Sequence, residues 1–463
     1  MTDPLPRLVS HVSGLRFDAL PLSAVSRAKV FILDTLGVGA AGASGADLQA
    51  VERLAESWGA GGEAQVWGKA GRLPAPSAAF VNAYRIHSLE FDCLHERAVL
   101  HPMAAIMSAL LASCDRRSRR GAPVDGARLI AACIAGVDVA TFLGFAARGP
   151  LRFFRPSTAG GFGATAALAN LAGLDADRAL SAFGIQYSQA CGTMQAHLEG
   201  SPCLGLQVGF AARAGLVSVD LAEAGFPGPR DVLTGRHGYF RLFEGDQFQV
   251  EGEIDRIGRE FQVEELAHKP FPSGRLTHGA VDALMRLRET LGFAAEDVRL
   301  FECLVPPVVA RQVGRPDVPH PAANYAKLCI PFVAATYLRR GEVAVDGFLG
   351  QEVLDDPATH AMAARVVVHE DDNPDLNAMT PQRFRLTLSD GSRHELTLDH
   401  VLGHPKVPLT HEQHLAKFRA AWRSGGLAAE AGERLIETVD ALETLEDAAA
   451  LSDLLAPPRG EGR

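Results

Sequence analysis

The sequence lacks any C-x-x-C pair, and its seven cysteines are spread through 463 residues without regular spacing. This pattern argues against the common structural zinc sites and against the disulfide framework of small secreted proteins. Such a cysteine set suits a reducing compartment, so we expect a cytoplasmic protein. The motifs G-x-S-x-G, H-E-x-x-H and the P-loop are also missing. We therefore expect no metal site.

Long apolar runs and an excess of positive charge are missing too. No stretch reaches about 18 uninterrupted apolar residues, and the N-terminal residues lack the features of a signal peptide, so neither a membrane span nor a signal peptide is expected. Lys and Arg number 45 against 55 Asp and Glu, a net charge of −10. Nucleic acid is therefore not an expected partner. An anionic substrate stays compatible, because a few buried cations set the potential of a pocket.

Ala-rich apolar stretches recur at helical spacing from residue 23 to about residue 225, separated by short breaks that contain Gly, Pro or Asp. This periodicity predicts a helical domain. Its long, apolar helices are expected over residues 104–114, 126–145, 163–174 and 206–224.

After about residue 255, segments rich in β-branched and aromatic residues predict strands, and Ser389, Asp390 and Gly391 predict a hairpin turn. A helical tail follows over 410–455, and 457–463 are expected to be disordered. The fold class is mainly α, with a large all-helical domain and a smaller α+β domain. The expected division is an N-terminal helical part (1–265), an α+β domain (266–404) and C-terminal helices that return to the helical domain (405–463).

The densest polar cluster precedes an apolar helix and contains two carboxylates, Glu90 and Asp92, and two imidazoles, His95 and His101. A loop before a helix N-terminus can present titratable groups to a pocket, and the helix dipole favours anions nearby. The cluster is therefore a candidate site. The alternative is a solvated loop, or a buried group that only forms hydrogen bonds.

Two further loops carry cations. Arg155 precedes Gly160 and Gly161, and glycines before a helix let backbone N–H groups approach an anion closely. The spacing is not G-x-G-x-x-G, so a dinucleotide site is not expected; the alternative is a purely structural helix start. The other loop runs over residues 268–278 and holds two cations and two imidazoles, which suit a carboxylate receptor. Its alternative is a solvated interdomain loop. The candidate residues there are Lys269, Arg275 and His278.

These segments together resemble the MmgE/PrpD family, which includes 2-methylcitrate dehydratases, cis-aconitate decarboxylases and iminodisuccinate epimerases. The resemblance runs nearly from end to end and rests on the order and spacing of several motifs. The similar segments are 28–38 with its Asp-x-x-Gly element, 82–102, 163–175, 209–229, Lys269-Pro270-Phe271-Pro272 with His278, and 326–332.

The resemblance implies a helical domain formed by the N-terminal part and the C-terminal tail, an inserted α+β lid domain and an active cleft between them. It also implies a homodimer, no metal or organic cofactor and a small polycarboxylate substrate. His101 matches the family's His before Pro, and Lys269 matches its Lys before the Pro-aromatic-Pro turn. Asp92 matches the second acid of the family's Asp-Phe-Asp-Asp run.

Several positions depart from the family pattern. Arg155 stands where the decarboxylases have a catalytic His, and an arginine can bind a carboxylate but cannot act as a neutral base. The other departures are Glu90 for Asp, Cys93 for an acid, Leu94 for Thr, Leu204 for Lys and Phe332 for Tyr. These changes weaken a strict dehydratase or decarboxylase interpretation, because His95, His101 or other groups would have to replace the missing proton donors.

Three hypotheses follow. The first is a lyase on a di- or tricarboxylate, in which His101 removes the proton alpha to a carboxylate before water or carbon dioxide is lost. Its other expected catalytic groups are Lys269, Asp92 and His95, and its substrate-binding groups are Glu90, Arg155, Arg275 and His278. The second is an epimerase or isomerase, which returns the proton to the same substrate. The third is a non-catalytic paralogue that binds a carboxylate or a partner protein.

Overall fold

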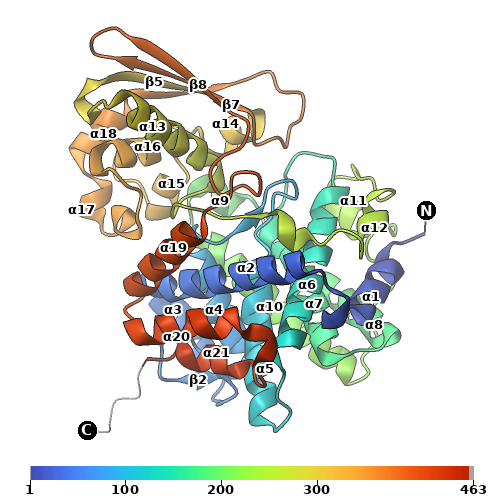
Figure 1. Cartoon of the computed structure of the whole chain (residues 1–463). Helices are drawn as coiled ribbons and strands as arrows, with labels where there is room; N and C mark the ends of the chain where they lie inside the picture. The colour runs from blue at the N-terminus through green and yellow to red at the C-terminus, as the bar shows by residue number, and fades with distance from the viewer. Residues whose placement is uncertain (1, 458–463) are drawn as a thin grey trace, which may run out of the picture.

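The computed structural model describes residues 2–457, so all but one residue of the segment predicted to be disordered lie outside the described part. Helices from residues 5–256 pack into one body (Figure 1). They are α1 (Leu5–Gly14), α2 (Leu22–Ala41), α3 (Leu48–Ser57), α4 (Ala75–His87), α5 (Met103–Arg119), α6 (Gly126–Ala146), α7 (Arg155–Ala172), α8 (Ala176–Tyr187), α9 (Gln195–Glu199), α10 (Cys203–Glu223), α11 (Tyr239–Phe243) and α12 (Glu253–Arg256).

Helices α6 and α10 are long and apolar enough to cross a membrane by length and composition alone. The most apolar 18-residue window of α6 is wholly buried inside the protein, and 61% of the corresponding window of α10 is buried. Surrounding helices thus cover α6 on all sides, which explains why its sequence shows no polar face.

Helix α7 begins at Arg155, so the prediction of a glycine loop ahead of this helix is wrong. Gly160, Gly161 and Gly163 lie inside the helix, where the backbone N–H groups are committed to helical hydrogen bonds. A Cβ on Gly163 would lie 2.8 Å from the Cβ of Ala140 and 2.9 Å from the carbonyl oxygen of Gly136. The glycine there allows the close approach of α6 and α7.

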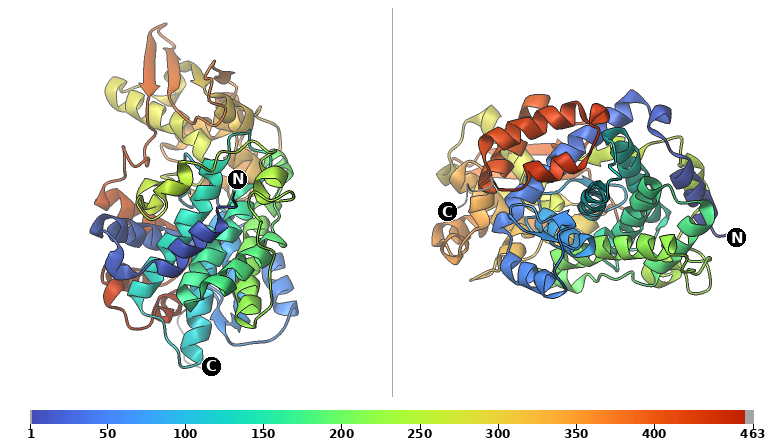
Figure 2. Two further views of the ribbon diagram at one scale, coloured as in Figure 1. Left: turned by 90° about the vertical axis from the view of Figure 1, so that its right-hand side faces the viewer. Right: turned by 90° about the horizontal axis from the view of Figure 1, so that it is seen from below.

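The first two of the C-terminal helices lie beside α2 (Figures 1 and 2), and the third contacts α5, so the last part of the chain packs on the helical body. Thr410 and Gln413 form a capping box at the start of α19. Lys417 on α19 contacts Asp34 on α2, with 2.6 Å between Nζ and Oδ1. These helices are α19 (His411–Ser424), α20 (Ala429–Asp440) and α21 (Ala449–Leu454).

A smaller α+β part contains a four-stranded mixed sheet in the order β6-β5-β7-β8. Strands β7 and β8 form the predicted hairpin, and Gly391 in its turn has a φ of +85°. Helices α13 and α16 pack on the sheet (Figure 1). The elements are α13 (His278–Leu291), β5 (Val298–Val305), α14 (Pro307–Val313), α15 (Ala323–Lys327), α16 (Ile330–Arg340), α17 (Gln351–Leu354), α18 (Pro357–Ala363), β6 (Val366–Glu370), β7 (Gln382–Leu388) and β8 (Arg393–Leu398).

The two parts have separate hydrophobic cores. Leu266 belongs to the core of the helical body, and Ala267 belongs to the core of the α+β part. Val401 is the last residue of this second core. Phe418 belongs to the helical core again. On this ground we propose the division 1–265, 266–404 and 405–463. Two short strand pairs are β1 (Ala64–Gln65) with β2 (Arg72–Leu73), and β3 (Leu94–His95) with β4 (Leu266–Ala267).

Candidate active site

The short antiparallel pair β3–β4 brings two distant loops together. Leu94 pairs with Ala267 and His95 with Leu266, so the polar loop after α4 lies against the segment that leads to Lys269. Glu90 has a φ of +52°, a left-handed conformation that costs about 1 kcal/mol or more for a residue other than glycine. The surrounding structure therefore has to hold the backbone of Glu90 in this conformation.

Lys269 and Glu90 form a buried ion pair, with 2.8 Å between Nζ and Oε2. The Lys269 side chain is fully buried, and the Glu90 side chain is nearly so. Burial alone would raise the pKa of Glu90, but Lys269, followed by His87, outweighs it and holds this pKa well below its usual value. The Glu90 carboxylate is therefore ionised at neutral pH.

Asp92 lies between two imidazoles. Its Oδ2 is 3.0 Å from Nδ1 of His87 and 3.5 Å from Nδ1 of His101. Burial alone would raise the pKa of Asp92, but the two imidazoles lower it to about 2. For His87, burial acts to lower the pKa, but Asp92 and Glu90 outweigh it and raise the pKa. The two carboxylates on either side of the His87 ring thus favour its protonated form.

The protonation of His101 follows from its contacts. Nδ1 lies 3.3 Å from the carbonyl oxygen of Asp92 and 3.1 Å from that of Cys93. Carbonyl oxygens only accept hydrogen bonds, so Nδ1 carries the proton and Nε2 keeps a free lone pair. Burial, and then the Lys269 ammonium, lower the pKa of His101 to about 4 although Asp92 opposes them. The imidazole is neutral at pH 7.

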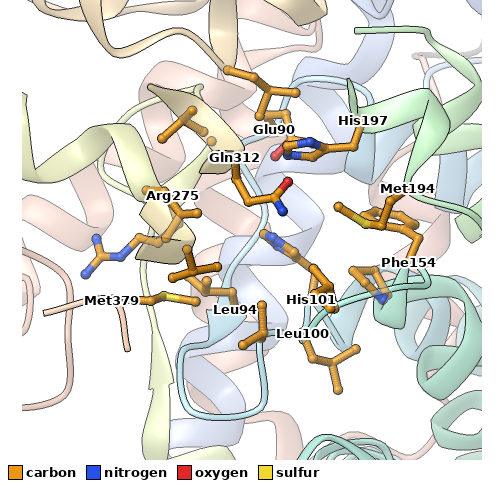
Figure 3. A pocket seen from close by; sticks show the side chains of 18 residues that line it. Glu90, Leu94, Leu100, His101, Phe154, Met194, His197, Arg275, Gln312 and Met379 are labelled. Carbon is orange, nitrogen blue, oxygen red and sulfur yellow. The ribbon is translucent and has the colours of Figure 1, made fainter. Parts of the chain in front are cut away.

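His101 and Glu90 line a cavity between the helical body and the α+β part (Figure 3). About 620 Å³ of space is unfilled when the open solvent at the mouth of the cavity is counted. His197 and Gln312 add polar groups to it. Its other lining residues are Leu94, Val99, Leu100, Leu151, Phe154, Pro156, Met194, Gly274, Arg275, Leu276, Val308, Val313, Leu328 and Met379.

Two of the predicted substrate-binding cations are already paired inside the protein. Arg155 donates to both carboxylate oxygens of Glu244, at 3.0 and 2.9 Å, and to the carbonyl oxygen of Ala98. Arg275 contacts Glu96 at 2.7 Å, and its guanidinium points away from the cavity (Figure 3). Direct substrate contacts by Arg155 and Arg275 stay predictions, and each would require an existing ion pair to open.

Two predicted imidazoles lie away from the cavity. His95 packs against Phe145, and burial lowers its pKa to about 3. His278 contacts the carbonyl oxygen of Ser273 and packs against Phe271. Neither is among the lining residues. Asp92 and Lys269 do not line the cavity either, but they contact His101 and Glu90, which do, so of the predicted residues the structure gathers Glu90, Asp92, His101 and Lys269. The roles predicted for His95 and His278 stay predictions.

Sequence reasoning missed four polar side chains of this region: His87, His197, Gln312 and Lys327. His87 stands three residues before Glu90, a spacing that could have extended the cluster. Burial lowers the pKa of His197 to about 4, and it lowers the pKa of Lys327 to about 8. No motif marks His197, Gln312 or Lys327, because they come from separate segments that only the fold brings together.

Two groups among the described residues have three potential metal-ligand atoms within 4.8 Å of one another. In one, the Nδ1 atoms of His87 and His101 face Asp92. In the other, formed by Asp34, His268 and His414, the Lys417 ammonium contacts Asp34. In each group the carboxylate already has an imidazole or an ammonium as its partner. The expectation that the protein needs no metal stays a prediction.

Both parts of the chain match one known protein family. Residues 6–251 match the MmgE/PrpD N-terminal domain, and residues 271–444 match the MmgE/PrpD C-terminal domain. The human protein named cis-aconitate decarboxylase is 30% identical over 458 residues, which cover 96% of this chain and 93% of that protein. The mouse protein of the same name is 28% identical, covering 96% and 92%. One from Aspergillus terreus is 26% identical, covering 96% and 94%.

Proposed function

Because this chain belongs to the MmgE/PrpD family, we propose that it is a cofactor-independent lyase acting on a small di- or tricarboxylate. The relatives named cis-aconitate decarboxylase support an enzyme of the dehydratase or decarboxylase type. The proposed reaction begins with proton transfer at the carbon next to a carboxylate. The cytoplasmic location and the homodimer remain predictions.

The observation that carries the proposal is the orientation of His101. Its Nδ1–H is held by the carbonyl oxygens of Asp92 and Cys93, which leaves the Nε2 lone pair available to a substrate in the cavity. A neutral imidazole in this tautomer is a general base. The Asp92 carboxylate stabilises the imidazolium that forms, as the aspartate of a catalytic triad does.

Removal of the proton leaves enolate-like negative charge on the substrate carboxylate. Lys269 does not line the cavity, but its buried ammonium contacts the lining residue Glu90, and a buried cation stabilises developing negative charge more strongly than an exposed one does. In a dehydration, the electron pair then forms the double bond, and His101 returns its proton to the departing hydroxyl group. In a decarboxylation, the electron pair comes from the C–C bond that breaks, and the His101 imidazolium donates its proton to the substrate carbon. The neutral resting state of His101 favours dehydration.

Proton NMR of candidate acids in deuterated water tests the proposal. Hydroxylated and unsaturated di- and tricarboxylates are incubated with the wild type, His101→Asn and Lys269→Met. We expect new product signals with the wild type and a loss of rate of about 10²-fold or more in His101→Asn. If no acid gives product or exchanges hydrogen for deuterium with the wild type, or if the His101 variant keeps full activity, the proposal fails.

A second candidate, an epimerase or isomerase, is favoured by one observation. His197 lines the same cavity as His101, and burial lowers the pKa of both imidazoles to about 4. Two imidazoles around one substrate can exchange a proton on a single carbon. Deuterium incorporated into recovered substrate without any loss of water or carbon dioxide would identify this reaction.

A further inference from the structure

The cavity has a polar end and an apolar end. Figure 3 shows Glu90, His197 and Gln312 near one another, with the His101 ring beside them. Leu94, Leu100 and Met379 lie beyond His101 at the other end (Figure 3). A bound substrate with its reacting carbon at His101 would therefore place one part among polar groups and the other against aliphatic side chains.

The charge around the polar end is small. Lys269 and Lys327 balance Glu90 and Asp92, which leaves Arg315, whose guanidinium contacts His197 and the carbonyl oxygen of Gln312, as a surplus positive charge. Asp92 and Glu90 also favour the protonated form of His87, so the surplus of about two positive charges suits two substrate carboxylates. Arg155 and Arg275, the other cations considered for this site, are each paired with a glutamate. Among residues 2–457, the lysines and arginines that line the cavity are limited to Arg275, which is paired with Glu96, so a third carboxylate at the apolar end would have no unpaired cation beside it. An unpaired buried charge costs several kcal/mol.

We propose that the substrate is a small dicarboxylate with an apolar substituent in the place where a tricarboxylate has its third carboxylate. The two carboxylates lie toward the polar end, and the substituent contacts Leu94, Leu100 and Met379. The inference rests on the proposed function, because it places the reacting carbon at His101. It adds the chemical class of the substrate, which we infer from the side chains that line the cavity.

Calorimetric titration with two matched acids tests the inference. cis-Aconitate is maleate with a carboxymethyl group, and 2-isobutylmaleate has a branched alkyl group of nearly the same shape in its place. Both are titrated into the wild-type protein at pH 7. We expect the alkyl acid to bind at least about tenfold more tightly, because it avoids the desolvation of a third carboxylate.

A variant of the apolar end gives the matched control. Met379→Lys places an ammonium on an unbranched side chain of similar length, so it should reduce or reverse the preference for the alkyl acid. Met379→Leu keeps the wall apolar and should keep the preference. Circular dichroism of both variants checks folding, and the wild-type comparison decides the inference even if a variant does not fold.

The outcomes separate this inference from the proposed function. Equal or tighter binding of cis-aconitate by the wild type overturns the substrate class, and so does an absence of binding by either acid at millimolar concentration. A clear preference for the alkyl acid without product or deuterium exchange leaves the substrate class standing as a binding specificity and overturns the lyase proposal.

Discussion

The Nζ atom of Lys269 lies 2.8 Å from Oε2 of Glu90, although the two residues are 179 positions apart in the sequence. The contact joins the segment after β4 to the loop after α4, and both side chains are buried. The contact keeps the Lys269 ammonium near the loop that carries His101, where it helps to lower the pKa of that imidazole.

Removing one partner of this pair should strongly destabilise the protein. Lys269→Met leaves the Glu90 carboxylate buried without its ammonium, so we expect a loss of about 3–5 kcal/mol in the free energy of unfolding. Lys269→Met combined with Glu90→Gln removes both charges and should recover much of that loss. Urea denaturation of the two variants and the wild type measures the difference. Equal stability of the single and double variants would contradict a direct ion pair.

The pH profile of kcat/KM should show an acid limb set by His101. Its pKa is lowered to about 4, so the imidazole stays neutral from pH 7 down to about pH 5 and becomes protonated near pH 4. Activity that depends on the neutral base should therefore fall only below about pH 5. Because Asp92 favours the imidazolium, Asp92→Asn should move the limb to lower pH and reduce kcat. A limb near pH 6.5 would contradict the assigned environment.

Asp92 should also make the stability of the protein depend on pH. Its pKa in the folded protein is about 2, below its ordinary value of 3.8. The resulting stabilisation is present above about pH 4 and is lost as the pH falls through about 2, because protonation favours the unfolded state. Urea denaturation between pH 5 and pH 2 should show a smaller loss in Asp92→Asn than in the wild type. Identical pH dependence would contradict this role.

Arg155 should stabilise the fold through Glu244. Its pair is bidentate, and both side chains are 2% exposed. Arg155→Met should cost about 3–5 kcal/mol, and Arg155→Met with Glu244→Met should be much closer to wild-type stability. Thermal unfolding compares them. If the single variant kept wild-type stability but lost affinity for a carboxylate ligand, the earlier prediction of a substrate contact would be supported instead.

Two glycines on α7 offer a matched test of helix packing. A Cβ at position 163 would lie 2.8 Å from Ala140, whereas a Cβ at position 160 would lie 3.6 Å from Ala105, an ordinary contact distance. Gly163→Ala should destabilise by about 1–3 kcal/mol through overpacking. Gly160→Ala should stabilise by up to about 1 kcal/mol, because alanine has the higher helix propensity. The opposite order in urea denaturation would contradict the close approach of α6 and α7.

Much of the architecture followed from local patterns. The predicted helix over 126–145 corresponds to α6, and the turn at Ser389, Asp390 and Gly391 joins β7 to β8. The start of α7 was missed because glycines usually mark loops. In this helix they are required by its closeness to α6, which is a tertiary property.

The sequence by itself determined the helical and strand periods, the family resemblance and the polar segments from which the site is made. These depend on residue order over short distances or on the order of motifs along the chain. The tertiary structure decided which of those polar groups are available. Arg155 and Lys269 are both buried cations from predicted site loops, and neither lines the cavity itself. Arg155 is paired with Glu244, which does not line the cavity, whereas Lys269 is paired with Glu90, which does. Partner choice over such distances is set by packing, and no local sequence pattern encodes it.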